Sequence, residues 1–165
     1  MPSTLVLESC KALAANNLTI TFAESATAGS LCAAFAMAPQ SGQVLKGGIV
    51  CYDAVLKEHI LHIPPGIIKK YTPESAEVTE QLSRRLKKLI KADVYVAVTG
   101  LTTSGGSETP EKPVGTMFMH MIWEEKSLGL REVYRGKPED IIAQAVDRVA
   151  RMVLDLIRDV KKVEN

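Results

Sequence analysis

The chain has 165 residues and a formal net charge of +1, with 46% hydrophobic and 24% charged residues. This length suffices for one domain with a full hydrophobic core and is short for two. The low net charge argues against a nucleic-acid or membrane surface, and no apolar run approaches the roughly 20 residues of a membrane span. We therefore expect one globular domain over residues 1–165 that binds neither nucleic acid nor membrane.

Two features favour the cytoplasm. The N-terminal segment 1–17 has no basic region, and Glu8 interrupts its apolar stretch, which is more typical of a helix than of a secretory signal. The cysteines Cys10, Cys32 and Cys51 are odd in number, far apart and form no CxxC pair. We expect neither a disulfide framework nor a structural zinc site, and a reducing compartment is the natural home for such a chain.

The first half of the chain alternates between helix and strand patterns. Apolar spacing predicts a helix over residues 3–16 and a strand over 18–23. An Ala-rich helix over 25–38, with Ser25 as its N-cap, should follow. Residues 48–52 form a β-rich run typical of a second strand, and two prolines with a glycine at 64–66 indicate a turn.

The second half contains the strongest strand and helix signals. Thr72 and Pro73 are typical of a helix start, and this helix should present Leu82, Leu86, Leu89 and Ile90 on one face. The remaining predictions are a strand over 93–99, a polar glycine-rich loop over 100–113, a strand over 114–123 that alternates in polarity, its hairpin partner over 128–134, and an amphipathic helix from Pro138 that frays at residues 161–165.

Helices separate the first three predicted strands, whereas the last two strands follow each other directly. Parallel strands need a crossover connection, which is usually a helix. The order therefore predicts an α/β fold with three α/β/α layers and a mixed, mostly parallel sheet in which strands one to three are parallel.

Three polar segments follow these parallel strands and should meet at one sheet edge, where open α/β sheets bind their ligands. They are residues 23–27, 52–57 and 99–113. Ser25, at a strand-to-helix turn, is a candidate nucleophile that backbone N–H groups could assist. Lys57, at the neighbouring strand end, is the candidate base when partly desolvated, and Tyr52 is a candidate proton relay. On the alternative interpretation Ser25 is an N-cap, Tyr52 ends a strand, and Lys57 is a surface cation.

Three weaker patterns have simpler explanations. Gly100, Gly105 and Gly106 could bring backbone N–H groups to a phosphate, but they match no nucleotide-binding motif, and a mobile surface loop is the alternative. The pair His59 and His62 lacks a supporting ligand cluster, so we expect no metal site. The basic run at 84–88 fits the solvated face of a helix.

The same three segments carry a family resemblance. AESATAGS at 23–30 resembles the AESCTGG segment of the CinA C-terminal domain family, and GGIVCYDAVLK at 47–57 resembles its GGxVxYSNxxK. VTGLTTSGGSETPEKPVGT at 98–116 resembles its xTGIAGPGGGTPEKPVGT. The three motifs agree in order and spacing, and the resemblance covers nearly the whole chain.

The resemblance implies a cytoplasmic amidohydrolase that converts nicotinamide mononucleotide to nicotinate mononucleotide and ammonia in NAD recycling, with no metal or cofactor. The family's proposed serine, tyrosine and lysine fall on Ser25, Tyr52 and Lys57. Ser25 would attack the amide carbonyl, and Lys57 with Tyr52 would manage the protons. The candidate substrate-binding residues of the motifs are Thr27, Gly29, Thr99, Gly100, Gly105 and Gly106. Family members tend to form homo-oligomers. Some carry an N-terminal molybdopterin-type domain, which this sequence lacks, so we expect a stand-alone form.

The departures from the motifs bear on substrate. Ala28 replaces a glycine that would allow closer backbone approach, and Ala54 replaces an asparagine amide. Asp53 adds a negative charge near a pocket expected to take a phosphate. The altered surroundings, which include Ala26 and Thr102, leave two alternatives to nicotinamide mononucleotide hydrolysis. One is an amidohydrolase with another carboxamide substrate, and the other is a catalytically inactive ligand-binding homologue.

Overall fold

The computed structural model describes residues 1–163, and it describes side chains for residues 1–159. Five strands form one sheet in the order β2-β1-β3-β4-β5. Their bounds are β1 Ile20–Glu24, β2 Leu45–Val50, β3 Val94–Gly100, β4 Thr116–Trp123 and β5 Lys126–Val133. β1 pairs in parallel with β2 and β3, and β4 runs antiparallel to β3 and β5. The predicted α/β class, the mixed sheet and the parallel arrangement of the first three strands are confirmed.

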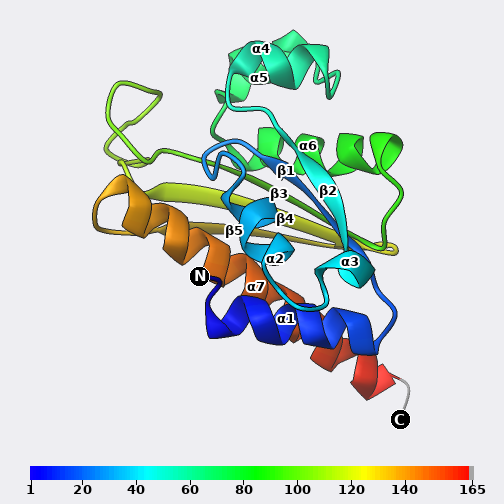
Figure 1. Cartoon of the computed structure of the whole chain (residues 1–165). Helices are drawn as coiled ribbons and strands as arrows, with labels where there is room; N and C mark the ends of the chain where they lie inside the picture. Colours follow the sequence, from blue (N-terminus) through cyan, green and yellow to red (C-terminus); the bar gives the residue numbers. More distant parts are fainter. Residues whose placement is uncertain (164–165) are drawn as a thin grey trace.

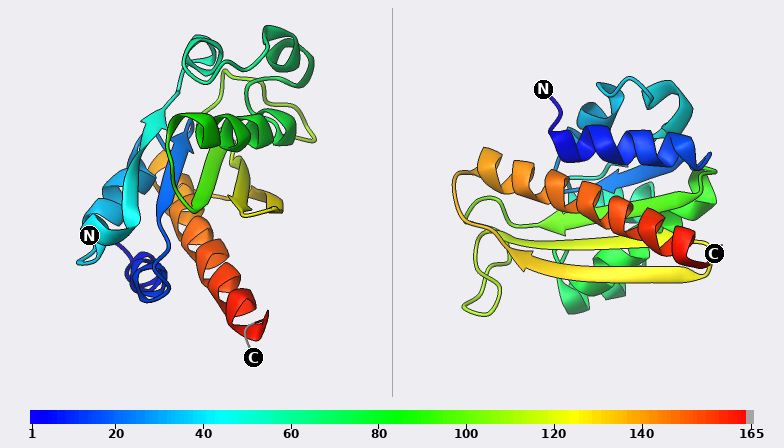
Figure 2. Two further views of the ribbon diagram at one scale, coloured as in Figure 1. Left: turned by 90° about the vertical axis from the view of Figure 1, so that its right-hand side faces the viewer. Right: turned by 90° about the horizontal axis from the view of Figure 1, so that it is seen from below.

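Helices cover both faces of the sheet (Figure 1). One face packs against α1 (Thr4–Ala15), α2 (Ser30–Ala36), α3 (Ser41–Val44) and the long α7 (Pro138–Val163). The other packs against α6 (Ala76–Leu89), while α4 (Ala54–His59) and α5 (Pro65–Tyr71) lie beyond the carboxyl end of β2. Figure 2 shows α1 and α7 side by side under the sheet, which gives the three predicted layers.

β4 shows how both faces are used. The alternation in 114–123 suggested one polar face, but nearly all of β4 is buried. Met119 and Met121 pack into the layer with α7, and Ile122 packs into the layer with α6. His120 is buried on the α6 side, where a hydrogen bond of 2.7 Å between its Nδ1 and Ser83 Oγ satisfies this ring nitrogen. A sheet covered by helices on both sides buries even the polar half of an alternating strand.

Two predicted helices begin later than expected, and helix α5 was not predicted. The helix expected from Ser25 begins only at Ser30, after a turn over 25–29. The prolines at 64–65 start helix α5 instead of marking only a turn, because proline fits the first helical position. Thr72 ends α5 with φ +69°, and Ser75 is the N-cap of α6, where its Oγ accepts from Val78 N–H. Leu89, expected on the buried face, is 49% exposed.

No helix within the described residues is long and apolar enough to cross a membrane. Residues 164–165, and side chains from residue 160 onward, lie outside the described part of the chain. Residues 161–163, where fraying was expected, form the end of α7, and the expectation for residues 164–165 stays a prediction.

Candidate active site

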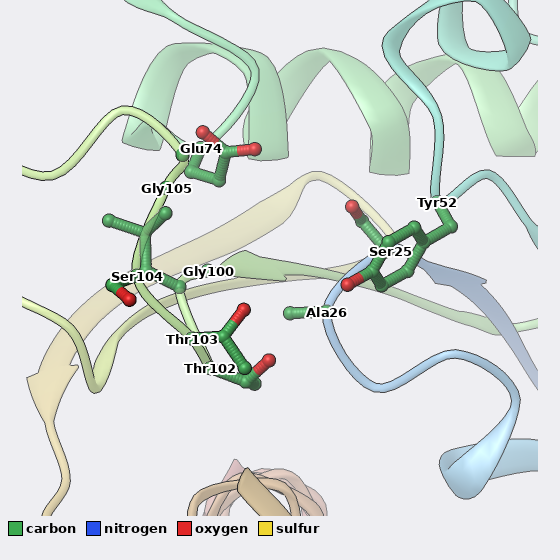
Figure 3. A pocket seen from close by; sticks show the side chains of 11 residues that line it. Ser25, Ala26, Tyr52, Glu74, Gly100, Thr102, Thr103, Ser104 and Gly105 are labelled. Carbon is green, nitrogen blue, oxygen red and sulfur yellow. The ribbon is translucent and has the colours of Figure 1, made fainter.

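The parallel strands deliver their polar segments to one cavity, as the topology predicted. The cavity has a volume of about 230 Å³ and lies beyond the carboxyl ends of β1, β2 and β3 (Figure 3). Its walls come from Ser25 and Ala26 after β1, Tyr52 after β2, and residues 100–106 after β3. Glu74, from the segment between α5 and α6, forms the side of the cavity away from Ser25 and Tyr52.

A buried lysine sits directly behind the serine. Lys57 Nζ donates to Ser25 Oγ at 3.0 Å, within the hydrogen-bond reach that we expected. Lys57 is fully buried, and Ser25 is 4% exposed. Lys57 belongs to the short helix α4 rather than to a strand end, and Asp53 caps this helix by accepting from Val55 N–H at 2.7 Å. The cap fixes the first turn of α4 and with it the direction from which Lys57 approaches Ser25.

The contacts of Lys57 fit both the ammonium and the neutral amine. Nζ also donates to the backbone carbonyls of Cys51 at 2.9 Å and Tyr52 at 3.1 Å. An ammonium group fills all three contacts as donor. A neutral amine has two N–H bonds, which can remain on the two carbonyls, so its lone pair is left facing Ser25 and can accept the serine proton.

Burial lowers the pKa of the Lys57 ammonium below its ordinary value, and the negative charges of Glu74 and Asp53 oppose this shift in part. Burial has the opposite consequence for the adjacent thiol, because it raises the pKa of Cys51 to about 11. Cys51 is therefore a protonated thiol at neutral pH and a poor nucleophile. Ser25 therefore remains the candidate nucleophile of this site.

Tyr52 contacts Lys57 through its backbone and not through its side chain. Its carbonyl holds Lys57, whereas its side chain is 60% exposed and borders the cavity. No hydrogen bond joins the Tyr52 hydroxyl to Ser25 or Lys57 among the described residues. The ring is placed to form a wall for a flat substrate group.

The N-terminus of α2 is already occupied, which corrects the idea that it assists Ser25. The Glu24 carboxylate is fully buried and accepts from the N–H groups of Gly29, Leu31 and Cys32 at 2.8–3.0 Å. These orphan donors at the helix start would otherwise be available to an anion. Glu24 is thus the internal cap of α2, a role that sequence inspection missed because the helix begins later than its composition indicated.

The turn after β1 retains two candidate oxyanion donors. Ser25 N–H donates to the Val98 carbonyl, and Ala28 N–H donates to the Ser25 carbonyl. Within the described residues, the N–H groups of Ala26 and Thr27 have no assigned acceptor. Ala26 lines the cavity next to Ser25 whereas Thr27 does not, so we take the Ala26 N–H as the candidate donor.

The predicted substrate-binding residues separate into two groups. Gly100, Gly105 and Gly106 line the cavity, whereas Thr27, Gly29 and Thr99 do not. Thr27 and Thr99 are fully buried, and Thr99 Oγ1 is hydrogen-bonded to Thr79 at 2.8 Å inside the α6 layer. Gly100 also has a packing role, because a Cβ there would lie 2.7 Å from the Thr116 carbonyl oxygen.

Sequence inspection missed Glu74 and Lys112. Lys112 Nζ donates to Thr72 Oγ1 at 2.7 Å, to the Glu74 carbonyl at 3.0 Å and to Ser107 Oγ at 2.7 Å. It thereby fastens the glycine-rich loop to the segment between α5 and α6. Ser107 Oγ in turn donates to the Glu74 carboxylate at 2.5 Å. The EKP string that contains Lys112 was the available signal, but two of its partners, Thr72 and Glu74, lie 40 and 38 residues earlier in the chain.

Among residues 1–159, whose side chains the structure describes, no group of three or more His, Cys, Asp or Glu side chains is arranged to hold a metal ion. The pair His59 and His62 lies on the exposed surface around the end of α4.

Comparison with curated proteins finds CinA-like relatives of this chain. A CinA-like protein of Thermotoga maritima is 36% identical over 140 residues, which cover 85% of this chain and 33% of the relative. One from Petrotoga mobilis is 33% identical over 141 residues, covering 85% of this chain and 34% of the relative. The chain thus spans about a third of the length of these curated relatives.

Solved structures of the CinA superfamily share the fold. A Klebsiella pneumoniae protein superposes with a TM-score of 0.88 at 23% identity, covering 94% of this chain and 96% of that one. An Escherichia coli protein gives 0.86 at 26% identity, covering 92% and 88%. The model of the CinA C-terminal domain matches residues 3–157, and the chain therefore belongs to the CinA C-terminal domain family.

Proposed function

We propose that this chain is an amidohydrolase in which Ser25 and Lys57 hydrolyse a primary carboxamide. The observation that carries the proposal is the 3.0 Å contact between Ser25 Oγ and the fully buried Lys57 Nζ, at the wall of a cavity. A hydroxyl needs an adjacent base to become a useful nucleophile, and a desolvated lysine can supply one.

The reaction has two steps. Ser25 Oγ attacks the amide carbon while its proton passes to Lys57 Nζ. The C–N bond then breaks, and the nitrogen leaves as ammonia with the proton from Lys57. Water next attacks the acyl-serine ester, gives a proton to Lys57 and releases the carboxylate as Ser25 recovers its proton. The Ala26 N–H is the donor that we assign to the developing oxyanion.

Nicotinamide mononucleotide is the first substrate to examine, because the family resemblance implies it. The Tyr52 ring at the cavity wall offers an apolar face to a pyridine ring. The second candidate is a different carboxamide, and the presence of the Glu74 carboxylate in the cavity favours it.

The test is ammonia release by the purified protein from nicotinamide mononucleotide and from a panel of other primary carboxamides. We expect turnover of at least one pyridine carboxamide without an added cofactor. Absence of ammonia release across the panel, with the protein folded, would contradict the proposal and favour a ligand-binding homologue without turnover.

A further inference from the structure

The charge of the cavity wall bears on the part of the substrate that does not react. Glu74 is the one charged residue that lines the cavity, and no lysine, arginine or histidine joins it within the described residues. Ser107 holds its carboxylate in place at 2.5 Å. Since Glu74 lies on the side of the cavity away from Ser25, it faces the far part of any molecule whose amide reaches Ser25 (Figure 3).

The Gly105 N–H, which could have bound a phosphate, is already paired with a carboxylate of its own loop. The Glu108 carboxylate accepts from Gly105 N–H at 2.7 Å, and this contact is the main reason that the pKa of Glu108 lies below its ordinary value. A phosphate would have to displace Glu108 before it could use this N–H group. The Glu108 carboxylate does not line the cavity, but Glu108 and Glu74 both interact electrostatically with Lys112, so a second negative charge lies in the same neighbourhood.

The lysines nearby leave no N–H donor for a ligand, although the charge of Lys112 interacts with both Glu74 and Glu108. All three hydrogens of the Lys112 ammonium are donated within the protein, to Thr72, Glu74 and Ser107. Lys57 is fully buried behind Ser25. A phosphate in the cavity would therefore meet the Glu74 carboxylate with no lysine N–H left to bind it. Such like-charge contacts are a common means of rejecting a ligand.

We propose that the substrate is a primary carboxamide whose remaining part is cationic or neutral and carries no phosphate, and that Glu74 is the residue that selects against the phosphorylated form. This inference rests on the proposed amide hydrolysis at Ser25 and deepens it. An N-ribosylated pyridinium carboxamide without phosphate fits the description, because its ring carries a positive charge and its sugar offers hydroxyl donors to Glu74.

Nicotinamide riboside and nicotinamide mononucleotide form a matched pair of probes, since they differ only in the phosphate. We expect the wild-type kcat/KM for ammonia release to be about tenfold or more higher for the riboside. Glu74→Gln should narrow this ratio by about tenfold. Glu108→Ala should narrow it as well, because it frees the Gly105 N–H for a phosphate. Glu77→Gln is the control, since Glu77 is exposed on α6 and does not line the cavity.

Two results would overturn the inference. One is a wild-type preference for the mononucleotide. The other is a ratio that neither Glu74→Gln nor Glu108→Ala changes more than Glu77→Gln does. The wild-type ratio decides the matter even where a variant does not fold.

Binding to the Ser25→Ala protein separates this inference from the proposed function. Calorimetric titration with each probe should give a Kd about tenfold lower for the riboside. If that preference is found but the wild type hydrolyses neither probe, the proposed function fails and the inference stands. If Ser25→Ala binds neither probe, or prefers the mononucleotide, the inference fails whatever the turnover.

Discussion

At the scale of single residues, the site depends on two buried ionisable side chains that form hydrogen bonds with backbone atoms. Lys57 is anchored on the carbonyls of Cys51 and Tyr52, and Glu24 is anchored on the first N–H groups of α2. Both are fully buried, so each must find hydrogen-bond partners inside the protein. Glu24 and Ser25 are adjacent, and the turn that presents Ser25 is therefore fixed from both sides.

The lowered pKa of Lys57 predicts the pH dependence of the reaction. The base is the neutral amine, so kcat/KM should rise with pH as Lys57 loses its proton and should level off above its pKa. Because burial lowers this pKa, the rise should be centred below 10.5, the ordinary value for lysine. A pH profile of ammonia release measures this.

Lys57→Arg is the control for the pH profile, because a guanidinium does not lose its proton in proteins. It should be inactive at every pH. A profile of the wild type that is flat from pH 6 to 10, or an active Lys57→Arg variant, would contradict the role of Lys57 as base.

Glu24→Gln should destabilise the protein by about 2–3 kcal/mol, because the amide NH₂ would face backbone donors that now share a carboxylate. Urea denaturation measures the change. Glu8→Gln, on the exposed side of α1, should stay within about 0.5 kcal/mol of the wild type. Equal stability of the two variants would show that Glu24 is not the cap of α2.

Ala28 lies at φ +46°, in the left-handed region that glycine adopts without a steric penalty. Ala28→Gly should therefore raise the free energy of unfolding by about 0.5–1 kcal/mol after the entropic cost of glycine. Ala143→Gly, at an exposed position of α7, should lower it by about 1 kcal/mol. If both variants are destabilised alike, the turn before α2 is not strained at Ala28.

At the scale of elements, the sequence predicted best those strands and helices whose own residue pattern is enough to define them. The strand at 93–99 and the helix from Pro138 were predicted well because long periodic runs bury continuous faces. The start of α6 was placed too early, because Thr72 and Pro73 are a good local signal for a helix start. The chain satisfies Thr72 differently, by ending α5 there and by accepting from Lys112.

The loop from 101 to 113 depends on Lys112 for its attachment to the segment between α5 and α6. Lys112→Met should raise the rate of amide hydrogen exchange across the loop and raise KM for the substrate, because residues 100–106 form one wall of the cavity. Exchange measured by mass spectrometry reports this change. Lys88→Met, on the exposed face of α6, should leave loop exchange unchanged. If amide hydrogen exchange in the loop is as slow in Lys112→Met as in the wild type, Lys112 does not fasten the loop to the segment between α5 and α6.

At the scale of the whole molecule, alternating helices and strands were sufficient to predict the layers and the edge at which Ser25, Tyr52 and Lys57 meet. They could not predict that Glu74 lines the cavity or that Glu24 caps α2. Both roles depend on where helices begin and on the direction of the side chains. Thr99 illustrates the same limit. It belongs to a segment that forms a wall of the cavity, but its side chain points away from the cavity and hydrogen-bonds Thr79 of α6.

Ammonia release by Ser25→Ala, measured together with its thermal midpoint, tests the central claim most directly. Residues that act as one catalytic unit lose nearly all activity on the first deletion, so kcat/KM should fall by about 10³-fold or more. The midpoint should stay within a few degrees of the wild type, since Ser25 caps no helix. Turnover near the wild-type level in folded Ser25→Ala protein would contradict the account.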